Sequence, residues 1–125
     1  MKIAVTSTGT TLDATVDPRF GRCSCFVLVE TEDMSFEAID NESSALGGGA
    51  GIQSAQLMAH KGVKAVLTGN CGPNAHQTLS AAGIDVVVGC SGTVSEVVEQ
   101  FKSGQLRAAS APNVAPHAGM RGKGP

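Results

Sequence analysis

Four cysteines are the residues of this chain with the widest choice of chemistry. Cys23 and Cys25 are separated by one residue, Cys71 lies between two glycines, and Cys90 follows an apolar run. Two cysteines at that spacing on a strand project their thiols to the same face, so Cys23 and Cys25 are candidate metal ligands. Free cysteine is also common in small buried cores, so plain packing is the alternative for the pair and for Cys90.

The loop around Cys71 indicates an anion site. Gly69 and Gly72 allow a sharp turn and a close approach of the backbone to a ligand, and Pro73 suits the first position of a helix. Free N–H groups at a helix N-terminus favour anions and lower the pKa of a nearby thiol, which makes Cys71 a candidate metal ligand. His76 follows in the first helical turn as a weaker candidate ligand. The expected anion contacts in this loop are Asn70, Gly72 and Asn74.

A second loop carries the positive charge that an anion site needs. Arg19 and Arg22 flank Phe20 and Gly21 in a segment that is predicted to be irregular. One interpretation is a solvated loop in which one arginine pairs with Asp17. The interpretation that we favour is that the two guanidinium groups neutralise an anionic ligand.

A run of small residues before the first predicted helix resembles a phosphate-binding loop. It lacks the lysine and hydroxyl of a Walker A motif, and Ser54 stands where the last glycine of a dinucleotide-binding motif belongs. We therefore expect an anion site here and no dinucleotide site. The expected contacts are Gly48, Gly49, Ala50 and Gly51.

Hydrophobic periodicity predicts the elements that position these groups. Strands are expected at residues 2–7, 23–30, 36–41, 63–68 and 84–88, and helices at 52–62, 73–82 and 93–103, each closed by a glycine. The order β-β-β-α-β-α-β-α predicts an α/β fold with a five-stranded mixed sheet, order 3-2-1-4-5, with strand 2 antiparallel. Ligands gather at the carboxyl ends of parallel strands, so the cysteines, the arginines and the glycine loop should share one rim.

Composition limits the classes of function. The 125 residues with a formal net charge of −2 do not indicate a nucleic-acid binder. Residues 1–106 are expected to form one domain, and the acid-free, basic residues 107–125 a flexible tail. No signal segment or membrane-length apolar run is seen, so a cytoplasmic protein is expected, in which cysteines serve as thiols or ligands rather than disulfides.

Signatures of catalysis are missing from the sequence. There is no nucleophile elbow and no helical zinc-protease motif. Asp13, Asp17 and Asp85 could be imagined as a two-metal nuclease site, but Asp85 begins its predicted strand and so belongs to the opposite edge. A non-enzymatic function is expected.

Five segments, in order and with matching spacing, resemble one family. The segments are 1–5, 17–22, 49–51, 69–75 and 92–94. Over about residues 1–107 the chain is similar to the dinitrogenase iron–molybdenum cofactor biosynthesis family, of the NifX and NifB C-terminal type. The glycine loop and residues 66–75 are most similar to the orange-protein branch.

The resemblance implies an RNase H-like, three-layer α/β/α fold without nuclease activity. It implies that the protein binds an anionic metal–sulfur cluster of molybdenum with iron or copper, received from and passed to partner proteins, as a monomer or weak homodimer. The implied contacts are residues 19–22, 48–51 and 70–74. Arg19 stands where many members have histidine, which favours charge neutralisation over ligation there. Cys23 and Cys25 add thiols that the family does not typically have at this point.

Two other hypotheses for the function of the cysteines stay open beside the hypothesis of a cluster carrier. Cys23 and Cys25 could form a redox switch that alternates between dithiol and disulfide. Alternatively, the cysteines could hold a structural zinc ion in a partner-binding domain.

Overall fold

The computed structural model describes residues 1–42, 49–106 and 108. Its strands are β1 (Lys2–Ser7), β2 (Cys25–Glu30), β3 (Phe36–Asp40), β4 (Ala65–Leu67) and β5 (Asp85–Val87), and its helices are α1 (Ala50–His60), α2 (Pro73–Ala81) and α3 (Val94–Lys102). The sheet has the order β3-β2-β1-β4-β5, with β2 antiparallel to both neighbours and β1, β4 and β5 parallel. The predicted fold and strand order are confirmed.

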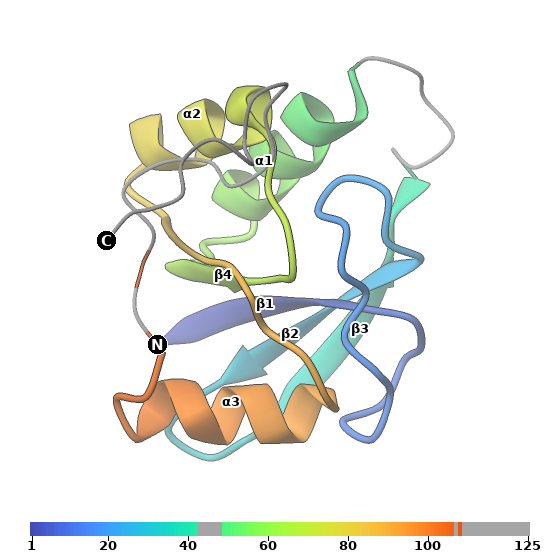
Figure 1. Ribbon diagram of the computed structural model, residues 1–125, viewed down its shortest axis with the longest axis vertical. Coiled ribbons are helices and arrows are strands. Elements are labelled where there is room, and N and C mark those ends of the chain that lie inside the picture. Colours follow the sequence, from blue (N-terminus) through green and yellow to red (C-terminus); the bar gives the residue numbers. More distant parts are fainter. Residues whose placement is uncertain (43–48, 107, 109–125) are drawn as a thin grey trace.

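The sheet forms the middle of three layers. Helices α1 and α2 lie on one side of it and α3 on the other, as Figure 1 shows. Successive side chains of β2 point to opposite faces of the sheet and so contribute to the hydrophobic cores on both sides. Phe26 and Leu28 belong to the core on the α1 side, while Val27 and Val29 belong to the core under α3. The strands are therefore apolar on both faces, as strands covered on both sides must be.

Local signals in the sequence explain where α3 begins. The Thr93 side chain accepts a hydrogen bond from the backbone N–H of Glu96 at 3.1 Å, and the Glu96 carboxylate accepts one from the Thr93 N–H at 2.8 Å. This reciprocal capping box satisfies two of the N–H groups that a helix start leaves open. The N-terminus of α3 is thus capped by its own residues, Thr93 and Glu96.

Strand β2 begins at Cys25 and not at Cys23, and this corrects the argument that placed the two thiols on one face. Gly21 has a φ of +94°, so the chain turns before the strand begins. Cys23 packs into the core on the α1 side. Cys25 shares its strand face with Val27 and Val29, which face α3. The period of two applies only inside a strand and does not relate Cys23 to Cys25.

Two of the expectations fall on residues that the structure does not describe. Gly48 and most of the expected tail lie outside the described residues. Within the described part of the chain, no helix has both the length and the apolar content to span a bilayer.

Candidate functional site

The loop that carries the arginines runs directly beside the loop that follows β4. The backbone N–H of Asn70 donates to the Pro18 carbonyl at 2.7 Å, and the N–H of Phe20 donates to the Asn70 carbonyl at 3.1 Å. Arg19 and Asn70 form a parallel bridge as a result. The two segments expected to meet at the carboxyl rim of the sheet therefore do meet there.

Gly69 is a glycine because of this close approach. A Cβ at this position would lie 2.7 Å from the Cα of Pro18 and 2.9 Å from its carbonyl oxygen. Real Cβ atoms do not approach backbone atoms so closely, so any side chain would push the two loops apart. The glycine is explained by loop packing.

Close packing of small residues also joins both helix starts to the arginine loop. A Cβ on Gly21 would lie 2.9 Å from the Cα of Gly51, and a Cβ on Gly51 would lie 3.2 Å from the Cβ of Ala75. Gly21 thus touches the first turn of α1, which in turn touches the first turn of α2. The rim is defined here as residues 17–22, 49–51 and 69–75.

The helices α1 and α2 begin without side-chain caps. Their N-cap residues are Gly49 and Gly72, neither makes a side-chain capping bond, and neither helix has an acidic residue in its first turn. The N-cap residues therefore supply no side-chain acceptor to the first-turn N–H groups, and the positive ends of the two helix dipoles lie together at the rim. This contrasts with α3, whose start is satisfied by Thr93 and Glu96.

Arg19 combines the two interpretations that the sequence left open. Its backbone N–H and its Nε donate to Oδ1 of the buried Asp17 at 3.0 and 3.3 Å. The Arg19 side chain is nevertheless 62% exposed, so the guanidinium remains available at the rim. Arg22 is exposed and makes no ion pair within the described residues.

A buried amide that sequence reasoning missed fixes the turn that carries Arg22. The side-chain nitrogen of Asn41 donates to the carbonyls of Gly21 and Cys23, each at 3.0 Å, and the hydroxyl of Ser54 donates to the Asn41 side-chain oxygen at 3.1 Å. Asn41 and Ser54 are both buried. A polar residue between a strand and a glycine-rich loop gives no signal of such a role in sequence.

The other expected site residues divide between rim and core. Phe20 is buried and its ring packs on Phe26 with centroids 5.7 Å apart, so it anchors the loop from below. His76 is buried in α2, with its Nδ1 3.5 Å from the Ser80 hydroxyl oxygen. Asn74 is exposed at the start of α2.

The thiols are buried and hard to ionise. Burial raises the pKa of Cys71 to about 11, so the expectation that the helix N-terminus lowers it is wrong. Burial, assisted by the Asp17 carboxylate, raises the pKa of Cys23 to about 12. Desolvation of a thiolate outweighs the helix dipole when the sulfur lies beneath the loop instead of on it.

No ligand set for a metal ion is formed by the described side chains. Among residues 1–42, 49–106 and 108, no three His, Cys, Asp or Glu side chains lie close enough to hold one metal ion. Cys23, Cys25, Cys71 and His76 are thus not gathered into a chelating cluster. The hypothesis of a structural zinc site gains no support from the geometry of the described residues.

The raised thiol pKa predicts a loss of stability at alkaline pH. A thiol whose folded-state pKa exceeds its ordinary value of 9.0 stabilises the fold below pH 9 and loses that contribution as pH rises toward the folded value. For Cys23 alone the free energy of unfolding should fall by about 1.4 kcal/mol per pH unit above pH 9. Urea denaturation from pH 8 to 11 measures this slope. In Cys23→Ala the free energy of unfolding should fall less steeply with pH, by about 1.4 kcal/mol per pH unit. Equal slopes would contradict a deeply buried neutral thiol.

Comparison with known proteins relates the rim to a family. The dinitrogenase iron-molybdenum cofactor family matches residues 1–104. The chain belongs to this family. A protein of Methanocaldococcus jannaschii is 35% identical over 94 residues, which is 73% of this chain and 80% of that protein.

Solved structures of similar proteins agree with this assignment. The apo form of the orange protein from Desulfovibrio gigas is 45% identical, with a TM-score of 0.88 over 90% of this chain and 96% of that one. A "putative NifB protein" from Thermotoga is 34% identical, with a TM-score of 0.74 over 86% of this chain and 91% of that one. The match to the iron–molybdenum cofactor family covers residues 1–104, so the rim lies inside the matched residues.

Proposed function

We propose that this protein is a non-enzymatic carrier that binds an anionic metal–sulfur cluster at the rim. The observation that supports this most is the meeting of two uncapped helix N-termini with Arg19 and Arg22. Backbone N–H groups and guanidinium groups are the donors that sulfide-rich anions accept from. The family and the likeness to the orange protein support a cluster of molybdenum with iron or copper as the cargo.

The raised pKa values of the thiols favour binding of the cluster through charge and hydrogen bonds over ligation by cysteine sulfur. A thiolate is the form of cysteine that ligates metals, and burial raises the pKa of Cys71 and Cys23, which makes their thiolates costlier to form. The N–H groups of α1 and α2 would contact the cluster sulfides, and Arg19 and Arg22 would balance the negative charge. The partners of such a carrier are proteins that donate or accept the cluster.

Anaerobic reconstitution tests this proposal. The protein is mixed with tetrathiomolybdate and either Cu(I) or Fe(II), desalted, and examined for retained metal and for charge-transfer bands in the visible spectrum. About one cluster per chain should be retained with one of the two mixtures, and the retained metals identify the cargo. Protein that emerges colourless and free of molybdenum from both mixtures would refute the carrier function.

Removing one exposed charge should weaken cluster binding. Arg22→Gln deletes a guanidinium that makes no ion pair within the described residues, so the fold should be unaffected. A hydrogen bond to a charged group contributes about 1.5 kcal/mol or more, so we expect about tenfold weaker binding of the reconstituted cluster. Lys64→Gln is the matched control, because Lys64 is exposed and precedes β4. It therefore lies at the amino-terminal ends of the parallel strands, on the side of the sheet opposite the rim. Equal loss in both variants would indicate only a net-charge effect.

A further inference from the structure

The strand β3 leaves one of its two edges unpaired. The N–H of Asn41 donates to the Ser24 carbonyl, and the N–H of Glu30 donates to the Ser35 carbonyl, which fixes the hydrogen-bonding phase of the β2–β3 ladder. In an antiparallel ladder the residues between such pairs direct their N–H and C=O groups away from the partner strand. The outward-facing residues of β3 are Phe36, Ala38 and Asp40.

This edge has little of the protection that exposed edges usually carry. Edge strands are commonly shortened, covered, or marked with proline or lysine. Strand β3 has five residues, contains neither proline nor lysine, and pairs with no described segment except β2. Phe36 at its start is 44% exposed. At the opposite edge of the sheet, β5 has only three residues.

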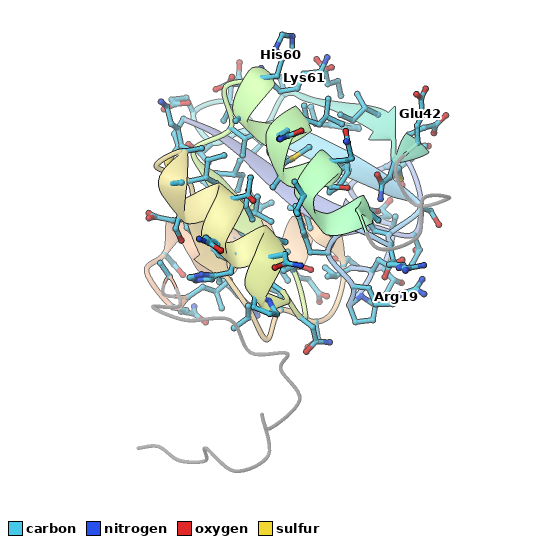
Figure 2. All side chains as sticks on the ribbon, turned by 90° about the horizontal axis from the view of Figure 1, so that it is seen from above. Arg19, Glu42, His60 and Lys61 are labelled. Atoms are coloured by element: carbon cyan, nitrogen blue, oxygen red, sulfur yellow. The ribbon has the colours of Figure 1, made fainter. Side chains whose placement is uncertain are left out.

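A groove runs between β3 and α1. It has a volume of about 730 Å³, and Ile39 from β3 and Leu57 from α1 give it an apolar floor. Asp40 and Glu42 line one end of the groove, and His60 and Lys61 at the end of α1 line it as well. Figure 2 shows Glu42 beyond the end of β3, while His60 and Lys61 stand at the far end of α1.

We propose that the β3 edge binds an extended segment of a partner protein, which adds to the sheet as a further strand. Its backbone would pair with Phe36, Ala38 and Asp40, which gives affinity independent of sequence. Alternate side chains would enter the groove over Ile39 and Leu57, so apolar residues suit those positions. This inference does not depend on the cluster-binding proposal.

The charge of the edge indicates that the partner segment is basic. Glu37 and Asp40 lie on β3 and Glu42 follows it, while β3 contributes no cation. A second copy of this chain, paired antiparallel through Phe36, Ala38 and Asp40, would place Asp40 opposite Phe36 and would bring no cation from its own β3 to these carboxylates. Lysine or arginine side chains in the partner would instead face Asp40 and Glu42.

Two peptides test the proposal with the full chain. The probes are fluorescein-labelled octapeptides, one alternating lysine and valine and the other alternating glutamate and valine. Fluorescence anisotropy should show at least tenfold tighter binding of the lysine peptide. In ¹⁵N-correlated NMR spectra, the amide shifts caused by that peptide should fall on β3 and on the groove side of α1.

Backbone variants separate strand addition from simple charge attraction. Ala38→Pro removes an outward N–H but none of the bonds to β2, so the domain should fold while losing at least tenfold in peptide affinity. Ala38→Val keeps the N–H and should bind as the wild type does. If Ala38→Pro fails to fold, the double change Asp40→Lys with Glu42→Lys serves instead and should reverse the preference toward the glutamate peptide.

Several results would overturn the inference. Unchanged binding by Ala38→Pro, no reversal by the charge swap, or no binding of either peptide by the wild type would each do so. A wild-type dimer that becomes monomeric in Ala38→Pro would identify a second copy as the occupant. Slow hydrogen exchange at the amides of Phe36, Ala38 and Asp40 in the free monomer would show that the chain covers this edge itself.

Discussion

Gly69→Ala is expected to destabilise the protein by about 2–4 kcal/mol, because overpacking and two lost hydrogen bonds add together. The new Cβ would lie 2.7 Å from the Cα of Pro18, so residues 17–22 must move away from the β4–α2 loop. That movement breaks the bonds between Asn70 and the carbonyl of Pro18 and between Phe20 and the carbonyl of Asn70. Urea denaturation measures the change in stability. Cluster retention should also fall, because residues 17–22 no longer lie against the β4–α2 loop at the rim.

A second glycine of the rim provides the control for Gly69→Ala. A Cβ on Gly49 meets nothing within 4 Å, and its φ of −98° suits any residue. Gly49→Ala should therefore cost less than about 1 kcal/mol, which is the difference between glycine and alanine at an N-cap. If the two variants lose equal stability, the contact between Gly69 and Pro18 does not constrain the fold.

Gly72→Asp is expected to change stability and cluster affinity in opposite directions. Gly72 is the N-cap of α2, its φ of −75° and ψ of 173° suit a capping residue, and a Cβ there meets nothing within 4 Å. An aspartate cap should stabilise the helix start by about 0.5–1 kcal/mol. The same carboxylate would occupy the open N–H groups and repel an anion, and a like-charge contact of about 4 kcal/mol before screening supports a loss of about a hundredfold in affinity.

Gly72→Ser distinguishes the charge from the cap. Serine also accepts a hydrogen bond from the first turn but adds no charge. Its thermal stability should match that of Gly72→Asp within about 0.5 kcal/mol, while its affinity for the reconstituted cluster should fall far less. Unchanged affinity in the aspartate variant would mean that the cluster does not contact the start of α2.

The elements of the fold could be predicted because their signals are local. Gly62, Gly83 and Gly104, which were expected to end the three helices, have φ values of +79°, +77° and +84°. Such residues stop a helix wherever the chain lies in space. The strand order then follows from the alternation of strands and helices and the handedness of their connections.

The details of the site could not be predicted because they depend on distant partners. Asn41 reaches the carbonyl of Gly21, twenty residues away, and nothing near it in sequence indicates that bond. The pKa of Cys71 depends on how deeply its sulfur lies beneath the loop, and the sequence shows only the helix that follows. The start of β2 was misplaced for the same reason, since a long-range amide holds the preceding turn.

The two glycine N-caps also bear on selectivity. If the cluster contacts backbone N–H groups near Gly49 and Gly72 and the guanidinium groups of the arginines, these donors respond to the size and charge of the cluster, and none of them ligates the enclosed metal. Thiometallates of equal shape would then compete on equal terms. The identity of the cargo would be decided by the protein that loads the carrier, and the fidelity of delivery would depend on that encounter more than on the rim.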